Sequence, residues 1–238
     1  MKTNPAILAR SIPRPLLALL FSSALGTALL IVRIVVTHRM QHAYLFGNLI
    51  LAWIPLLASM LLDQWEGNGS VAHWKRGAAC AVWFFFFPNA PYILTDLVHL
   101  GPKYYGRFWI DLLLILFFAI TGLVLAFLSL RSMQQRVQRR LNWFAGWLFV
   151  AAMSLLCGLG IYAGRFLRWN SWDVVARPWL IVNDLAEWLL TWFYRPLSIA
   201  FPLLFAIFLF TVYLTLVAIS TGEVIRKDSG QAGESSAA

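Results

Sequence analysis

Residues 87–100 read Phe-Pro-Asn-Ala-Pro-Tyr-Ile-Leu-Thr-Asp-Leu-Val-His-Leu and interrupt a very apolar part of the chain. Pro88 and Pro91 lack a backbone N–H, and each disfavours the helical conformation in the residue before it. An apolar helix that enters through Trp83 must therefore break here. Such a break persists beside apolar surroundings only when protein or water satisfies the freed backbone groups. The polar side chains that follow the break are the first candidates for function: Asn89, Tyr92, Thr95, Asp96 and His99.

The composition is typical of a membrane protein. The 238 residues are 61% hydrophobic and 12% charged, and the mean hydropathy is +0.72, whereas soluble domains carry about 25% charged residues. The net charge is +9, and the charged residues lie between apolar runs, where Lys and Arg set orientation and contact anionic headgroups. It therefore indicates a lipid bilayer and anionic lipid headgroups as partners, not nucleic acid. The two cysteines provide no disulfide framework and no zinc ligand set, and no motif identifies a cofactor or a metal.

Six stretches are long enough, or nearly so, to cross a bilayer, which takes about 20 apolar residues. The third is irregular because it contains the proline break. We therefore expect an all-α, polytopic transmembrane bundle that forms one domain over residues 1–221. Acids interrupt residues 179–194, whose Trp and Tyr favour a helix lying at the interface, and residues 222–238 are expected to be a disordered tail. The expected spans are 16–36, 44–62, 71–87 (extending toward 94), 109–130, 143–163 and 197–221.

The distribution of Lys and Arg favours a cytoplasmic location for both termini. With the N-terminus inside, the cytoplasmic segments hold 11 Lys and Arg residues and the opposite side holds 8. The short loop 131–142, which has four Arg and no acid, is the clearest single indication of this orientation. The tail from residue 222 would then be cytoplasmic as well.

The six-span order gathers the unusual polar residues at one end of the bundle. Spans with odd numbers end where spans with even numbers begin, whichever side is inside. Asn48, at the start of the second span, and Asp111, at the start of the fourth, therefore share a face with the break and with the loop after the fifth span.

That loop carries the second polar cluster, over residues 162–173. Arginine captures phosphate or carboxylate in a bidentate manner, although Trp and Arg at the end of a span also suit an ordinary aromatic belt with snorkelling side chains. The cluster contributes Arg165, Arg168, Trp169, Asn170 and Asp173 as candidates.

Each acidic candidate also has a structural interpretation. Asp111 could complement the dipole of its helix, or face the bundle interior as a functional carboxylate. Asp96 or Asp111 is predicted to pair with Arg165 or Arg168, because an isolated charge at membrane depth is costly. Asn48 suits an interhelical hydrogen bond. His38 and His42 have the i, i+4 spacing but no third ligand, which favours an interfacial position.

Three stretches resemble a known family. They are Asn-Leu-Ile-Leu-Ala-Trp-Ile-Pro at residues 48–55, Phe-Pro-Asn-Ala-Pro-Tyr-Ile-Leu-Thr-Asp-Leu at 87–97, and Gly-Arg-Phe-Leu-Arg-Trp-Asn-Ser-Trp-Asp at 164–173. They resemble the uncharacterised bacterial membrane family catalogued as domain of unknown function 1361, over roughly residues 44–221. The resemblance implies a multi-pass protein of the bacterial inner membrane and implies no activity.

Two functions stay open at this point. One is a membrane-embedded enzyme or binding protein for an anionic lipid or lipid-linked substrate on the non-cytoplasmic side. The other is a transport, accessory or scaffold protein whose polar layer is structural or docks a partner. In the first, residues 88–99 form the mouth of a pocket shared with 165–173, and Asp111 forms its floor. Catalysis would then fall to Asp96, His99, Asp111 and Asp173, and substrate binding to Asn48, Asn89, Tyr92, Arg165, Arg168, Trp169 and Asn170.

Overall fold

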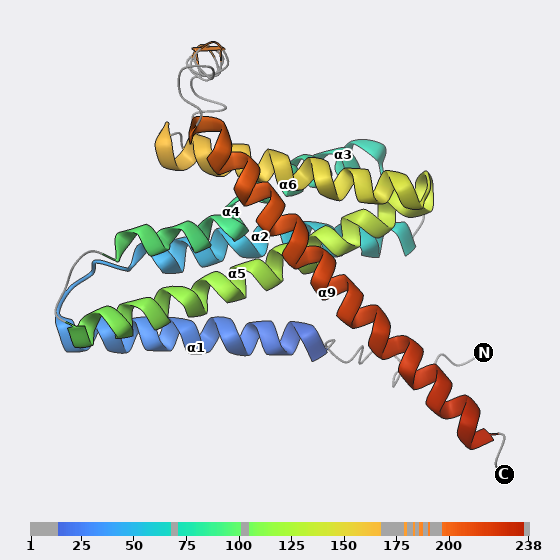
Figure 1. Cartoon of the computed structure of the whole chain (residues 1–238), viewed down its shortest axis with the longest axis horizontal. Helices are drawn as coiled ribbons and strands as arrows, with labels where there is room; N and C mark the ends of the chain where they lie inside the picture. Colours follow the sequence, from blue (N-terminus) through green and yellow to red (C-terminus); the bar gives the residue numbers. More distant parts are fainter. Residues whose placement is uncertain are drawn as a thin grey trace. The chain divides into compact units, whose positions relative to one another are not determined.

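The computed structural model describes residues 14–67, 71–100, 105–167 and 197–235, together with Trp179, Asn183, Ala186, Glu187 and Leu190. Every regular element within this part of the chain is helical (Figure 1). The elements are α1 (Arg14–Thr37), α2 (Tyr44–Gly67), α3 (His73–Phe86), α4 (Asn89–Tyr92), the 3₁₀-helix η2 (Ile93–His99), α5 (Tyr105–Arg140), α6 (Trp143–Phe166) and α9 (Leu197–Ser235).

Within the described residues, six helical stretches are long and apolar enough to cross a membrane, which confirms the expected all-α bundle of about six spans. They are Pro15–Thr37, Tyr44–Glu66, His73–His99, Phe108–Arg140, Trp143–Phe166 and Ile199–Ser220. The predicted interfacial helix at 179–194 falls mostly outside the described residues. The helix α9 continues to Ser235, whereas the sequence favours a disordered tail from residue 222; that tail and the single domain over 1–221 stay predictions.

The chain divides into two compact units, residues 1–129 and 130–238, which are described separately. The long helix α5 contributes its first part to one unit and its last turns to the other.

At the proline pair the helix changes type without leaving the helical conformation, because Phe87 and Pro88 keep right-handed helical backbone angles although a following proline disfavours them in Phe87. The helix α3 ends at Phe86, and the chain resumes as the single turn α4 and then as η2. Side chains next to the break donate to nearby carbonyl oxygens: Asn89 Nδ2 to Phe86 O at 3.2 Å, and Thr95 Oγ1 to Tyr92 O at 2.7 Å. Both bonds are local and join residues three apart in the chain.

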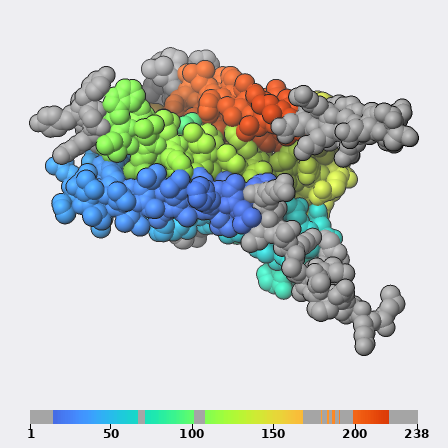
Figure 2. All heavy atoms as spheres, turned by 90° about the horizontal axis from the view of Figure 1, so that it is seen from below, coloured from blue at the N-terminus to red at the C-terminus, as the bar shows by residue number. Residues whose placement is uncertain are grey.

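In the first unit, α2 packs against α3, α4 and η2, and α1 lies beside the first part of α5 (Figures 1 and 2). A Cβ atom added at Gly26 of α1 would lie 3.1 Å from the ring of Phe117, so the two helices approach closely there. On α5, a Cβ atom at Gly122 would lie 2.7 Å from the carbonyl oxygen of Ala90 in α4. These small residues allow the broken span and α1 to pack on α5.

The outer side of α1 exposes large apolar side chains, including Phe21, Val35 and Val36. Exposed apolar surface of this extent would be unfavourable in water and is expected where a helix faces lipid. At its end, α1 stops at Thr37, and His38 adopts a left-handed conformation with φ 52°. This turn, uncommon for a residue other than glycine, begins the short loop 38–43 that leads into α2.

In the second unit, α6 packs against α9. The approach is closest at Gly158, where any Cβ atom would overlap the carbonyl oxygen of Pro202. Trp147 of α6 also lies edge-on to Tyr213 of α9, with ring centroids 6.2 Å apart. Asn142 caps α6, because its Oδ1 accepts from the backbone N–H of Ala145 at 2.7 Å.

Candidate functional site

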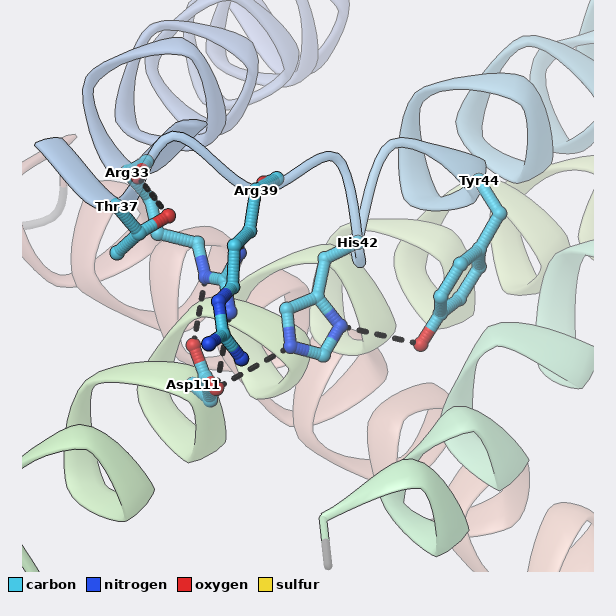
Figure 3. Close-up of polar contacts among 6 residues, drawn as sticks. All are labelled: Arg33, Thr37, Arg39, His42, Tyr44 and Asp111. Carbon is cyan, nitrogen blue, oxygen red and sulfur yellow. Dashed lines mark hydrogen bonds and ion pairs between the residues drawn. The ribbon is translucent and has the colours of Figure 1, made fainter. Parts of the chain in front are cut away.

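A buried ion pair joins the end of α1 to the beginning of α5 (Figure 3). Arg33 Nε donates to Asp111 Oδ1 at 2.7 Å, and Arg33 Nη2 donates to Asp111 Oδ2 at 3.1 Å. The two side chains are only 8% and 4% exposed. Two parallel N–H···O bonds give this pair a fixed geometry as well as a neutral sum of charge.

His42 lies on the other side of the same carboxylate. It comes from the loop between α1 and α2, and it is fully buried. Its Nε2 lies 3.2 Å from Asp111 Oδ2, and its Nδ1 lies 3.4 Å from the hydroxyl oxygen of Tyr44 (Figure 3). The contact of Nε2 with Asp111 is an ion pair when the ring is protonated, and in the neutral ring the tautomer decides whether Nδ1 donates to the Tyr44 hydroxyl or accepts from it.

The loop that carries His42 is held by Arg33 as well. Arg33 Nη1 donates to the carbonyl oxygen of Arg39 at 3.4 Å, and Thr37 Oγ1 donates back to Arg33 O at 2.7 Å (Figure 3). One arginine therefore orients both the carboxylate and the backbone of the loop that faces it.

A second buried carboxylate lies on the broken span. Asp96 of η2 is 2% exposed and accepts a hydrogen bond from Asn48 Nδ2 of α2 at 2.9 Å. Three residues further on, the exposed ring of His99 lies edge-on to Tyr44, with centroids 5.4 Å apart. Because residues three apart share a face of a 3₁₀-helix, Asp96 and His99 both contact α2.

These contacts form two neighbouring groups on α1, the 38–43 loop, α2, η2 and α5: the chain of contacts from Arg33 to His99, and the Asn48–Asp96 pair. Together we call them the polar layer. Its buried members hold the elements together, and its half-buried members Tyr44 and Asn48 and its exposed member His99 lie nearer the surface. The polar layer consists of Arg33, His42, Tyr44, Asn48, Asp96, His99 and Asp111.

Four candidates from the sequence lie in the polar layer: Asn48, Asp96, His99 and Asp111. Two other candidates lie beside the break and not in the polar layer. Asn89 donates to the carbonyl oxygen of Phe86, and Tyr92 is half-buried. Arg165 ends α6 in the second compact unit, half-buried. The remaining candidates, Arg168, Trp169, Asn170 and Asp173, lie outside the described residues, so a pocket shared with residues 165–173 stays a prediction.

Sequence reasoning missed Arg33, His42 and Tyr44. Asp111 has its bidentate partner in Arg33, which the sequence suggested only as a charge for setting orientation. His42 is buried beside Asp111 rather than interfacial. The signal was present, because the end of span one lies on the same face as the beginnings of spans two and four. Among the described residues, no group of three His, Cys, Asp or Glu side chains is arranged to hold a metal ion.

Comparison with known proteins gives one family. The model of DUF1361, described as a protein of unknown function, matches residues 47–216. No match was found among curated proteins or among solved structures. The matched range includes Asn48, Asp96, His99 and Asp111, while the other members of the polar layer precede it.

Proposed function

The chain belongs to the DUF1361 family of proteins of unknown function, and we propose that it is a membrane-embedded acid–base enzyme whose site is the polar layer. Its six apolar helices make it a multi-pass membrane protein. The observation that carries the proposal is His42, fully buried between the carboxylate of Asp111 and the hydroxyl of Tyr44. A carboxylate, an imidazole and a hydroxyl in this order form the arrangement that activates a hydroxyl group for proton transfer.

The proposed chemistry follows the order of the contacts. A substrate hydroxyl gives its proton to the oxygen of Tyr44 while the phenolic proton of Tyr44 passes to Nδ1 of His42. The resulting imidazolium faces the Asp111 carboxylate, which stabilises its positive charge, and Arg33 holds that carboxylate in place through two hydrogen bonds. As the substrate oxygen forms its new bond to the phosphorus of the anionic group, the bond from phosphorus to the leaving oxygen breaks, and the proton held by His42 returns through Tyr44 to that leaving oxygen. Asp111 and Arg33 are therefore positioning residues, and Tyr44 is the group that touches the substrate.

The substrate class follows from the position of the layer at the ends of the spans. An anionic headgroup or a lipid-linked group would reach Tyr44 from the bilayer surface, past the exposed side chains of Arg39 and His99. The polar layer would lie on the non-cytoplasmic side of a bacterial inner membrane.

A structural hub is the second candidate. It is favoured by the burial of both carboxylates, each of which already has a partner: Asp111 with Arg33, and Asp96 with Asn48. In a transport, accessory or scaffold protein the same pairs would fix α1, α2 and η2 on α5, and proton transfer would play no part. The two candidates differ in what the hydroxyl of Tyr44 is needed for.

Replacing Tyr44 by Phe tests that difference. The variant keeps the ring against His99 and removes only the hydroxyl, so folding should be retained while proton transfer is lost. Because general acid–base catalysis contributes about 10²- to 10⁴-fold in rate, Y44F should fail to restore the lipid composition of cells that lack the protein. Lipid extracts analysed by mass spectrometry give the readout. Y162F is the matched control, since Tyr162 stacks on Phe166 in the second unit, and a Y44F protein that restores the lipids as the wild type does would rule out the acid–base role.

Cysteine labelling tests the expected orientation. In a background without Cys80 and Cys157, Met40 in the α1–α2 loop and Leu141 in the α5–α6 turn are replaced singly by Cys, both being over 70% exposed (74% and 72%). With both termini cytoplasmic, a membrane-impermeant thiol reagent applied to intact cells should label M40C and not L141C. Labelling of both from outside, or of L141C alone, would contradict the orientation.

A further inference from the structure

A second polar cluster lies in the other compact unit, near the end of α5. Gln134 is fully buried, and its Oε1 accepts two hydrogen bonds, from the hydroxyl of Tyr213 at 2.6 Å and from Arg131 Nη1 at 3.0 Å. Because a guanidinium can only donate, the amide atom that it contacts must be the oxygen. We call these three residues the Arg131 clamp. The clamp holds a cation through neutral groups alone.

The surroundings of the clamp are rich in donors and poor in acceptors. Residues 131–142 contain four Arg and no acid, and Arg131 forms no ion pair with a carboxylate in the described part of the chain. Nε2 of Gln134 and Nε1 of Trp147 are also buried, and neither finds a hydrogen-bond acceptor among the described residues. Trp147 lies against the ring of Tyr213. A guanidinium has five N–H donors, so the bond to Gln134 leaves most of them for another acceptor.

The depth of the clamp identifies that acceptor. Arg131 directly follows the apolar run of α5 that ends at Leu130, and Trp143 and Trp147 begin the next span. Arg and Trp at the end of a span lie at the level of the lipid headgroups. The anionic groups available there are lipid phosphates, to which arginine binds in a bidentate manner.

We propose that Arg131, oriented by Gln134 and Tyr213, binds the phosphate group of an anionic phospholipid in the leaflet on the side of the α5–α6 turn. The site lies wholly within residues 130–238 and is independent of the polar layer and of its proposed reaction. Gln134 and Tyr213 act as positioning residues, since they fix the guanidinium and do not themselves carry charge.

Native mass spectrometry of the full-length protein in detergent tests this site, with phosphatidylglycerol as the anionic lipid and phosphatidylcholine as the zwitterionic one. The wild type should retain phosphatidylglycerol in preference. R131Q should weaken that binding by about tenfold or more, the value of one or two lost charge-assisted hydrogen bonds. Y213F keeps the charge but loosens the clamp, and should weaken binding by about threefold.

R139Q is the matched control, because it removes an exposed charge from the same helix end; it should change binding by about twofold or less. If R131Q does not fold, Q134M with Y213F carries the test, since both keep the arginine. Equal weakening by R139Q, or equal retention of the two lipids by the wild type, would overturn the proposal. Competition by soluble glycerol phosphate as effective as that by phosphatidylglycerol would overturn the lipid as the source of the phosphate.

Discussion

Replacing Arg33 by Met should destabilise the protein by about 3–5 kcal/mol, the cost of leaving a buried charge without its partner. Asp111 is 4% exposed in its side chain and receives two hydrogen bonds from Arg33. Without the guanidinium, its carboxylate loses two hydrogen bonds and must take up a proton or remain ionised in a dry site. The measurement is the unfolding of purified protein in mixed detergent micelles, together with the amount of folded protein in the membrane.

Arg39 provides the matched control for this substitution. It lies in the adjacent loop, its side chain is exposed, and its carbonyl oxygen accepts a hydrogen bond from Arg33. R39M should therefore leave stability nearly unchanged. The double variant R33M with D111L removes both charges, and it should recover much of the loss, because a buried pair is often replaced by apolar side chains at little cost. An R33M protein as stable as R39M would show that the ion pair does not hold α1 on α5.

The sequence predicted the arrangement of spans well, for physical reasons that act locally. Apolar length determines whether a helix can cross a bilayer, and a missing N–H determines where α3 must stop. Pro88 and Pro91 therefore specified the break, and the order of the spans specified which polar residues share an end. The presence of Asn48, Asp96, His99 and Asp111 in one layer follows from those two facts alone.

The pairing within that layer could not be predicted in the same way. The rotation of α1 against α5 decides whether Arg33 meets Asp111, and that rotation depends on the packing of Gly26 against Phe117. The burial of His42 depends on the path of a six-residue loop whose first residue, His38, is left-handed without being glycine. Neither feature has a signature in a short window of sequence, so charges far apart in the chain were assigned to other partners.

The burial of the carboxylates also changes how their roles are understood. The sequence suggested Asp96 and Asp111 as catalytic groups, but both are enclosed and hydrogen-bonded. A group that cannot reach a substrate can still act by orienting one that can, as Asp111 does for His42 in the proposed reaction. In the proposed reaction the half-buried Tyr44 is the residue that contacts the substrate, and His99 of η2 packs edge-on against its ring.

The hydrogen bond between Asn48 of α2 and Asp96 of η2 is the basis of the second prediction with a large expected effect on stability. Replacing Asn48 by Leu should destabilise the protein by about 1.5–3 kcal/mol, because the carboxylate of Asp96 loses a donor at a site where it is 2% exposed and water cannot replace it. The substitution keeps the approximate volume of the side chain, so the loss reports the hydrogen bond and not a cavity. Unfolding in mixed micelles measures it, and lipid analysis of the same variant in cells reports on the site.

Gly47 gives the control on the same turn of α2, since a Cβ atom added there meets nothing within 4 Å. G47A should be neutral or stabilise α2 by up to about 1 kcal/mol through helix propensity. N48L with D96L removes donor and acceptor together and should recover stability. If that double variant folds but fails to restore the lipids, Asp96 serves the site as well as the fold; if it restores them fully, the Asn48–Asp96 bond is a structural tie between α2 and the broken span. An N48L protein that unfolds no more readily than G47A would show that this bond contributes nothing to either.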